Sequence, residues 1–278
     1  MNYKSAFEYG IQQLQQADVP DAEWDARLLL EAVCDTDRTV LLAHPDREVS
    51  KQEQLQYEAV LAQRAKRVPL QHILGKTEFM GLPFAVNDKV LCPRPDTEVL
   101  VEEVMKHLHD GMKILDMCTG SGCILLSLLH YSNDCSGVGA DLSEDALQVA
   151  RLNGINLELN HCAHFLQSNL FEQIEGTFEI IVSNPPYIRS SEISDLMPEV
   201  RDYEPRMALD GEEDGLHFYR EITEQAKKYL PGGGMLFFEI GYDQGNDVQH
   251  IMIENGYQEV QIVKDFSGLD RVVYGVKI

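Results

Sequence analysis

From residue 93 onward, short apolar runs alternate with stretches of helical periodicity, and this alternation constrains the fold of the 278-residue chain more than any other feature. Strands that alternate with helices predict a parallel sheet covered by helices on both faces. Gly268 lies between the last two apolar runs and predicts that these two strands pair antiparallel. The expected strands are 113–116, 137–141, 165–167, 179–183, 235–240, 260–263 and 271–276.

Polar side chains stand at the ends of the first four expected strands. Ligands bind open α/β sheets beyond the carboxyl ends of the strands. These residues are therefore expected to line one cleft, although they are distant in the sequence. They are Asp116, Asp141, Asn169 and Asn184.

The first seventy-odd residues have helical patterns and no phosphate-binding loop. Ser50 and Glu53 form a capping-box pattern that opens a helix extending to about Arg67. Other apolar positions at helical spacing are Phe7, Ile11 and Leu14 in one stretch, and Trp24, Leu28 and Ala32 in the next. These stripes are expected to form the core of a small all-α bundle, whose exposed face is a candidate surface for docking a protein partner.

The chain is therefore expected to have three parts. Residues 1–75 form the helical docking domain, and residues 93–278 form the α/β domain. Between them, residues 76–92 have alternating apolar positions with glycine and Asn-Asp, which fits a β-hairpin linker.

The fourth strand ends in Asn184-Pro185-Pro186-Tyr187, a sequence suited to holding a planar NH2 group. The Asn184 side-chain oxygen and the Pro185 carbonyl can each accept one hydrogen, and neither proline offers a competing N–H donor. Tyr187 can lie against the flat group. The alternative is an ordinary strand-ending turn, because Asn-Pro is a common turn signal.

Residues 118–122 form a loop of small residues between the first strand and a helix. Glycine lets a backbone approach a ligand closely, and the start of a helix presents unpaired N–H groups. Position 125 is Leu, so the third glycine of a dinucleotide fingerprint is missing, and a nucleoside without phosphate fits better than NAD. Asp141 can accept hydrogen bonds from two ribose hydroxyls, or it can cap the helix that follows, a task for which Ser143 is better suited.

Composition limits the partners. The 46 acidic residues outnumber the 23 basic ones, and the net charge of −23 disfavours a protein that grips duplex DNA, although acidity can also serve solubility alone. No Cys-x-x-Cys pair is present, so no metal site is expected. The chain has neither a secretion signal at its start nor an apolar run long enough to cross a bilayer, so a cytoplasmic protein is expected.

In this order, the elements resemble a class I S-adenosylmethionine-dependent methyltransferase. Further motifs resemble the HemK/PrmC family, which methylates a glutamine side chain of bacterial class I peptide chain release factors. The shared stretches cover nearly the whole chain. They are Ala-Arg-Leu-Leu-Leu at 26–30, Pro-Leu-Gln-His-Ile-Leu-Gly at 69–75, Pro-Arg-Pro-Asp-Thr-Glu at 93–98, the Asn-Pro-Pro-Tyr turn, Glu-Pro-Arg-Met-Ala-Leu-Asp-Gly at 204–211, and Asp-Phe-Ser-Gly-Leu-Asp-Arg at 265–271.

The resemblance implies a Rossmann-like, mostly parallel seven-stranded sheet with an antiparallel last strand. It also implies that S-adenosyl-L-methionine is the methyl donor, that S-adenosyl-L-homocysteine is the product, and that no metal takes part. The methyl group would go to the side-chain amide nitrogen of the glutamine in the Gly-Gly-Gln motif of a release factor. A monomer that binds neither DNA nor a membrane is expected.

Site residues are carried over by the same resemblance. The expected catalytic residues are Asn184, Pro185 and Tyr187, and Pro186 and Leu91 join them in binding the substrate. The expected cofactor contacts are Cys118, Thr119, Gly120, Ser121, Gly122, Asp141, Asn169, Leu170 and Asn184.

Three of these positions depart from the family pattern. Cys118 stands where Gly is usual, which is acceptable if its φ is negative. Asn169 replaces the common Asp and keeps only a neutral acceptor for an adenine amino group, and Leu91 replaces an aromatic residue near the glutamine. Arg94 and Thr97 could reach the methionine end of the cofactor, although Thr97 could instead cap a helix.

Two rival interpretations remain. The turn is shared with nucleic-acid adenine and cytosine amino-methyltransferases, against which the acidic charge and the absence of a basic target-reading domain weigh. The other is a non-catalytic binding module that retains the methyltransferase fold. Intact Gly120, Gly122, Asp141 and Asn184 argue against such degeneration.

Overall fold

The computed structural model describes residues 1–278, which divide into two compact units. One unit comprises Met1–Gly75 together with the short segment Met197–Tyr203. The other comprises Lys76–Leu196 and Glu204–Ile278. A segment from the middle of the chain therefore folds with the amino-terminal helices.

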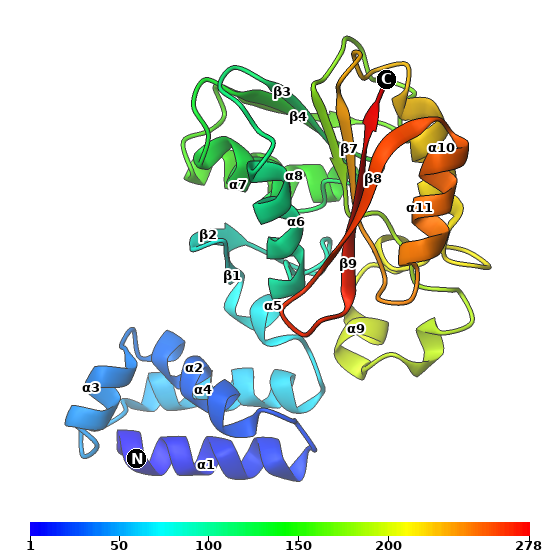
Figure 1. Ribbon diagram of the computed structural model, residues 1–278. Helices are drawn as coiled ribbons and strands as arrows, with labels where there is room; N and C mark the ends of the chain where they lie inside the picture. The colour runs from blue at the N-terminus through cyan, green and yellow to red at the C-terminus, as the bar shows by residue number, and fades with distance from the viewer. The chain divides into compact units, whose positions relative to one another are not determined.

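The first unit is entirely helical (Figure 1). Its helices are α1 (Tyr3–Gln16), α2 (Ala22–Val33), α3 (Arg38–Ala43), α4 (Lys51–Ala65), α5 (Leu70–Leu74) and α9 (Pro198–Tyr203). The predicted capping box is confirmed, since Ser50 and Glu53 exchange side-chain and backbone hydrogen bonds at the start of α4. Within this unit, Glu199 of α9 accepts hydrogen bonds from Arg64 and Arg67 of the amino-terminal segment.

One predicted apolar stripe of the bundle is wrong at two of its three positions, since only Leu28 packs against the core. Trp24 is 58% exposed and Ala32 is also exposed, whereas α2 buries Ala22, Asp25, Ala26, Leu29 and Leu30. The reason is a charged residue on the inner face: Asp25 accepts a hydrogen bond from Arg64 Nε at 2.6 Å, and both side chains are buried. Apolar periodicity alone placed the core face of α2 incorrectly because a buried ion pair interrupts it.

The second unit is built on a seven-stranded sheet, as predicted. Its strand order is β5-β4-β3-β6-β7-β9-β8, and only β9 runs antiparallel to its neighbours β7 and β8. The loop through Gly268 joins β8 to β9, as expected. The strands are β3 (Lys113–Met117), β4 (Ser136–Asp141), β5 (Ala163–Gln167), β6 (Ile180–Ser183), β7 (Met235–Glu239), β8 (Tyr257–Lys264) and β9 (Asp270–Lys277).

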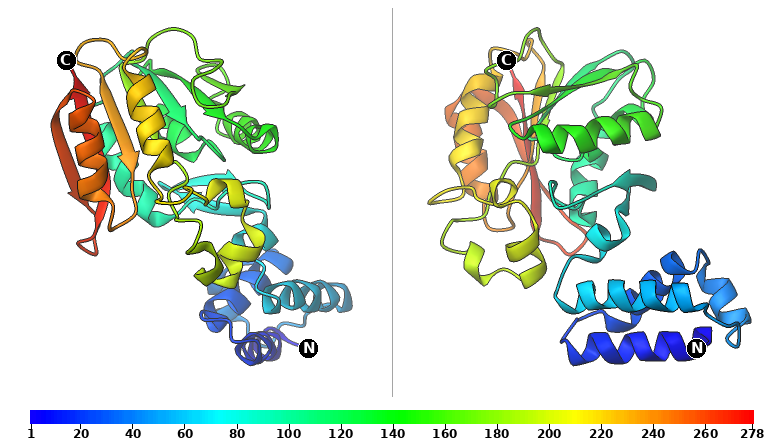
Figure 2. Two further views of the ribbon diagram at one scale, coloured as in Figure 1. Left: turned by 90° about the vertical axis from the view of Figure 1, so that its right-hand side faces the viewer. Right: turned by 180° about the vertical axis from the view of Figure 1, so that it is seen from behind.

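Helices cover both faces of this sheet. Figures 1 and 2 show α6 (Pro95–Met105), α7 (Cys123–His130) and α8 (Glu144–Asn156) on one side, and α10 (His217–Ala226) and α11 (Gly245–Glu254) on the other. Successive strand residues point to opposite faces. Accordingly, Ile114 and Ile180 pack in the first hydrophobic core, whereas Leu115 and Ile181 pack in the second. Strands that are apolar at every position therefore suit a sheet buried on both sides.

The hairpin consists of β1 (Lys76–Phe79) and β2 (Leu82–Ala85), which pair antiparallel. Phe79 and Phe84 are buried in the same hydrophobic cluster as α6 and α7, so the hairpin packs into the second unit. Short 3-10 turns η1 (Ile193–Asp195) and η2 (Arg206–Ala208) flank α9 in sequence. None of the helices has both the length and the apolar character needed to span a membrane.

Candidate active site

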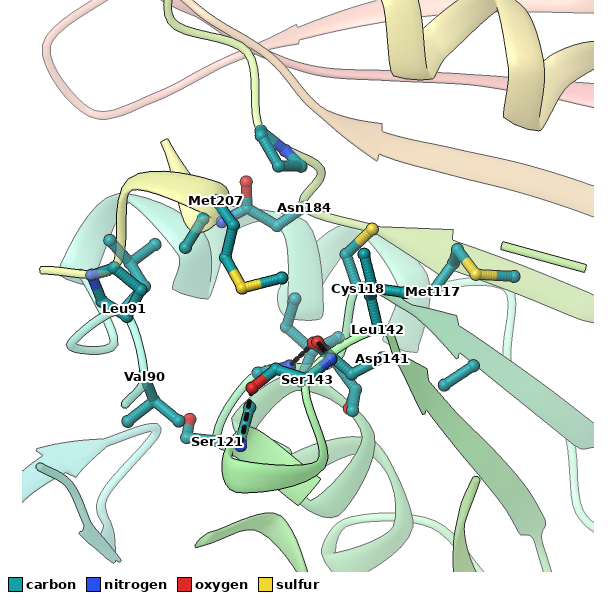
Figure 3. Close-up of a pocket in the computed structure, with 18 of the residues that line it drawn as sticks. Val90, Leu91, Met117, Cys118, Ser121, Asp141, Leu142, Ser143, Asn184 and Met207 are labelled. Carbon is teal, nitrogen blue, oxygen red and sulfur yellow. Dashed lines mark hydrogen bonds between the residues drawn. The ribbon is translucent and has the colours of Figure 1, made fainter. Parts of the chain in front are cut away.

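A cavity in the second unit opens beyond the carboxyl ends of β3, β4 and β6 (Figure 3). Most residues predicted to bind cofactor or substrate meet here. The predicted residues that line it are Leu91, Cys118, Thr119, Gly120, Ser121, Asp141, Asn169, Leu170, Asn184 and Pro186. Gly122, Pro185 and Tyr187 do not line it.

The loop from β3 to α7 forms the floor of the cavity with its backbone in left-handed conformations. Gly120 and Gly122 have φ values of 54° and 79°, which glycine adopts without steric cost. A Cβ atom on Gly120 would meet no protein atom within 4 Å, so the backbone is open to close approach by a ligand. Gly122 is the N-cap of α7 and lies behind the loop against Ala150, Leu126 and Phe165.

Cys118 does not meet the condition under which it would replace Gly without strain, a negative φ. Its φ is 62°, so a cysteine occupies the left-handed conformation that glycine would adopt without a penalty. Its side chain lines the cavity, and burial raises the pKa of the thiol. The thiol is therefore expected to be protonated and unreactive at neutral pH.

Asp141 stands at the end of β4 and holds the loop by its carboxylate. One oxygen accepts a hydrogen bond from Gly120 N at 2.9 Å, and the other accepts from Ser143 N at 2.9 Å. Each carboxylate oxygen retains a second lone pair for a ligand in the cavity. Burial raises the pKa of Asp141, and the backbone N–H groups oppose that shift. Ser143, not Asp141, caps α8, because its hydroxyl accepts a bond from Ala146 N.

Asp116 does not line the cavity, contrary to prediction. Its side chain is completely buried beneath the loop, where one oxygen accepts from the Thr119 hydroxyl at 2.5 Å and from Leu125 N at 3.3 Å. Burial raises the pKa of Asp116 to about 7. The carboxylate therefore supports the loop from behind and is not available to a ligand.

Asn169 and Leu170 form a further part of the wall after β5. The Asn169 side chain donates from Nδ2 to Glu172 at 2.9 Å, which leaves its amide oxygen as an acceptor. Leu170 has a φ of 48°, and its carbonyl accepts from the Ser168 hydroxyl at 2.6 Å. These bonds fix the backbone of the segment that borders the cavity.

Asn184 follows the last residue of β6 and lines the cavity. Its Nδ2 donates to the Thr97 hydroxyl at 3.5 Å, while its side-chain oxygen accepts no hydrogen bond from the protein. The next residue, Pro185, is buried, and its carbonyl also accepts no hydrogen bond from the protein. Thr97 lies inside the first turn of α6, whose N-cap is Arg94, so Thr97 does not cap this helix.

Tyr187 turns away from the cavity. Its hydroxyl lies 3.4 Å from Oε1 of the buried Glu239, and its carbonyl accepts from Gln244 Nε2 at 3.0 Å. Burial raises the pKa of the Tyr187 hydroxyl. In this conformation Tyr187 anchors the turn and offers no ring face to the cavity.

The remaining wall comes from residues before α6 and from η2. Arg94 lines the cavity, and its Nη2 contacts both carboxylate oxygens of Glu204, at 2.8 and 2.9 Å. The buried Glu204 precedes Pro205, Met207 and Ala208, which line the cavity too. In Figure 3, the Met207 side chain is drawn close to Asn184 in this view, and Leu91 is drawn farther to the left.

Comparison with known proteins places this geometry in a family. Residues 5–75 match the PrmC N-terminal domain, and residues 94–199 match the methyltransferase small domain. The release factor glutamine methyltransferase of Clostridium acetobutylicum is 43% identical over 91% of this chain and 90% of its own. That of Caulobacter vibrioides is 43% identical over 95% of this chain and 92% of its own. The chain belongs to the release factor glutamine methyltransferase family.

The solved structures agree on the fold. A methyltransferase from Pyrococcus furiosus superposes with a TM-score of 0.54 at 20% identity, covering 72% of this chain and 90% of that one. At this identity the likeness concerns only the Rossmann-like sheet and its helices. The predicted methyltransferase fold and the predicted family are both confirmed.

Two residues that support the Asn184–Tyr187 turn in this member of the release factor glutamine methyltransferase family were not predicted from its sequence. Glu239 ends β7, and Gln244 begins the next helix as the N-cap of α11. Glu239 is a polar residue at the carboxyl end of a strand, and this is the pattern by which Asp141 was predicted. The sequence therefore contained an indication of Glu239. Gln244 had none. Nowhere in the structure do three or more His, Cys, Asp or Glu side chains gather as metal ligands would.

Proposed function

We propose that this protein transfers the methyl group of S-adenosyl-L-methionine to the side-chain amide nitrogen of a glutamine. The glutamine is that of the Gly-Gly-Gln motif in class I peptide chain release factors. The observation that carries the proposal is the Asn184 carboxamide, whose free oxygen lines the same cavity as the Asp141 carboxylate. Family membership supports the substrate, because the relatives bear the name release factor glutamine methyltransferase.

The cavity fits the cofactor by the chemistry of its walls. Asp141 has free lone pairs for two ribose hydroxyls, and the open backbone at Gly120 leaves room for close approach. Asn169 and Leu170 are assigned to the adenine, for which the Asn169 oxygen is a suitable acceptor. Cys118, Thr119 and Ser121 complete the contact surface at the loop, and Gly122 acts through the backbone geometry that it allows.

When bound, S-adenosyl-L-methionine supplies a methyl group that is activated by attachment to a positively charged sulfur. The protein must then orient a poor nucleophile, because the lone pair of a carboxamide nitrogen is shared with its carbonyl. Asn184 Oδ1, which lines the cavity, accepts one N–H of the substrate amide. The carbonyl of the adjacent Pro185, which has no partner in the protein, accepts the other when the substrate enters, and the two bonds hold the nitrogen in a fixed plane. These bonds strengthen as the nitrogen gains positive charge, so they stabilise the transition state more than the ground state.

Leu91, Pro186 and Met207 provide the apolar surroundings of the substrate side chain. They exclude water from the amide, which strengthens the bonds to Asn184 and Pro185. Tyr187 anchors the turn through Glu239 and Gln244 in the structure, and in this proposal its ring turns toward the cavity on binding and contacts the glutamine. No general base is required, because the N-methylated amide is strongly acidic while cationic and loses its proton to Asn184, Pro185 or water.

Release factors as the partner, the cytoplasm as the location and a monomeric enzyme that does not bind DNA are parts of the same proposal. The net charge of −23 supports the absence of DNA binding, because a protein with this net charge repels phosphates overall. The helical unit is the proposed docking surface for the release factor, supported by its match to the PrmC N-terminal domain.

Transfer of isotope-labelled methyl tests the proposal. The substrates are a release factor, the same factor with its Gly-Gly-Gln glutamine replaced by alanine, and duplex DNA. Label on the unmodified factor alone is the expected result. Label on DNA would favour the nucleic-acid amino-methyltransferase that shares the Asn-Pro-Pro-Tyr turn, and label on none of the three would favour a non-catalytic binding module.

A further inference from the structure

A buried carboxylate stands behind the catalytic turn, and the proposed mechanism gives it no task. Glu239 ends β7 beside β6, one residue after the pair formed by Ser183 and Phe238. Asn184 follows Ser183, so Glu239 and Asn184 leave neighbouring strands at the same level. Glu239 is only 2% exposed, and its Oε2 atom has no hydrogen-bond partner. Burying a carboxylate is costly, which argues for a function that offsets the cost.

Four side chains from three elements lie close enough to Glu239 to influence its charge. They are Asp96 and Thr97 of α6, Arg271 of β9, and Tyr187 of the turn after β6. Burial raises the pKa of Glu239 to about 7, while the Thr97 hydroxyl and the Arg271 guanidinium oppose that shift by stabilising the charged form. The Thr97 hydroxyl lies near the carboxylate, and Glu239 Oε2, which has no hydrogen-bond partner, is free to accept its hydrogen.

Thr97 also contacts Asn184. Its hydroxyl lies 3.5 Å from Asn184 Nδ2, and Thr97 itself is 3% exposed. A hydroxyl has one hydrogen and two lone pairs. If the hydroxyl hydrogen points to Glu239, the Thr97 oxygen can only accept a hydrogen bond from Asn184. It therefore attracts the Asn184 NH2 group and repels the Asn184 amide oxygen.

This arrangement bears on catalysis because a carboxamide has two nearly isosteric orientations. With its NH2 toward Thr97, Asn184 presents its oxygen to the cavity and can accept a hydrogen from the substrate amide. With the amide flipped, it presents NH2 to the substrate NH2, so two donors face each other. The substrate would then lose one of the two acceptors that hold its nitrogen.

We propose that Thr97 and Glu239 are positioning residues that together fix the Asn184 carboxamide with its oxygen toward the substrate. The inference rests on the proposed methyl transfer and adds to it the relay from Glu239 through Thr97 to Asn184. Neither residue touches the reacting atoms. Their effect is expected chiefly in the rate of transfer, and because Thr97 also lines the cavity, cofactor affinity is measured beside it.

Substitutions at Thr97 and Glu239 test the relay. Thr97→Val keeps the side-chain shape but removes the hydroxyl, and Glu239→Gln places a donor where the hydroxyl hydrogen should point. Each is expected to lower the single-turnover rate of methyl transfer to the release factor roughly 10- to 100-fold at saturating cofactor. Affinity for S-adenosyl-L-homocysteine is expected to stay within about threefold. Thr97→Ser keeps the hydroxyl and is expected to recover most of the rate.

The pH profile is a second measurement that a purely structural role would not change. When Glu239 is protonated it can donate to Thr97, and the hydroxyl hydrogen then turns to Asn184 and favours the flipped amide. The transfer rate of the parental protein is therefore expected to fall as pH drops through about 7. Glu239→Gln is expected to weaken this inflection, while Asp116, whose pKa is also raised to about 7, still titrates in the same range.

Thr223→Val is the matched control, since Thr223 is also a buried helical threonine, on α10, and does not line the cavity. It is expected to transfer methyl at the parental rate. The relay is refuted if folded Thr97→Val transfers at the parental rate, or if its loss follows only a loss of cofactor binding. A parental protein that does not methylate the release factor refutes the proposed function instead, so the two failures are distinguishable.

Discussion

Asp141→Asn is expected to separate cofactor binding from folding. In the parental protein the two carboxylate oxygens accept from Gly120 N and Ser143 N, each at 2.9 Å. The asparagine has one oxygen only, so one of these N–H groups meets an NH2 donor. The proposed ribose contact loses an acceptor and its charge as well.

The expected effect on cofactor affinity is larger than the expected effect on the free energy of unfolding. A lost hydrogen bond to a charged group is worth about 1.5–3 kcal/mol, and about 1.4 kcal/mol is a factor of ten in affinity. Affinity for S-adenosyl-L-homocysteine is therefore expected to fall roughly 10- to 100-fold. The folded protein loses a similar hydrogen bond. The neutral asparagine also avoids the cost of burying a charged carboxylate, the same cost that raises the pKa of Asp141. The free energy of unfolding is therefore expected to change by less than about 2 kcal/mol.

Titration calorimetry and urea unfolding measure the two quantities. Because the pKa of Asp141 is raised in the folded protein, its stabilising contribution is present below the unfolded pKa and is lost as pH rises through the folded pKa. Cofactor binding has the opposite dependence, since it requires the ionised form and weakens on acidification. Asp145→Asn removes an equal charge from an exposed position outside the cavity and serves as control. Affinity of Asp141→Asn within about twofold of the parental value would refute the ribose assignment.

Two further changes test the site and its support. Asn184→Ala is expected to largely abolish methyl transfer while affinity for S-adenosyl-L-homocysteine, measured by calorimetry, stays within about tenfold, because it removes an orienting acceptor. Transfer at the parental rate would contradict the mechanism. Gly139→Ala is expected to lower the free energy of unfolding by about 1–3 kcal/mol in urea, because its Cβ would lie 2.7 Å from the Phe165 ring and 2.8 Å from the Thr119 hydroxyl. Gly232→Ala, whose Cβ meets nothing within 4 Å, is the control, and equal stability of the two variants would contradict the packing argument.

The parts of the fold that follow local rules could be predicted from the sequence. Apolar runs became strands because both faces of the sheet are covered, and Asp141 and Asn184 reached one cavity because both follow parallel strands. The same rule failed for Asp116. Its carboxylate turned inward because Thr119 and Leu125 N–H supply donors beneath the loop, and such donors cannot be located before the loop is folded.

Other features depend on contacts between distant residues. The core face of α2 was misplaced because Asp25 pairs with Arg64, which lies 39 positions away. Nothing in the sequence indicates that 197–203 folds with the amino-terminal helices, since the contact is made through Glu199 with Arg64 and Arg67. The positive φ of Cys118 also could not be predicted, because cysteine has no preference for the left-handed conformation.

The most direct measurement of the central claim is a crystal structure of this protein with S-adenosyl-L-homocysteine and a release factor. The account predicts that the Gly-Gly-Gln side chain enters the cavity and that its amide nitrogen lies within hydrogen-bond distance of Asn184 Oδ1 and the Pro185 carbonyl. A glutamine that binds elsewhere, or an Asn184 that presents its NH2 group to the substrate amide, would contradict it.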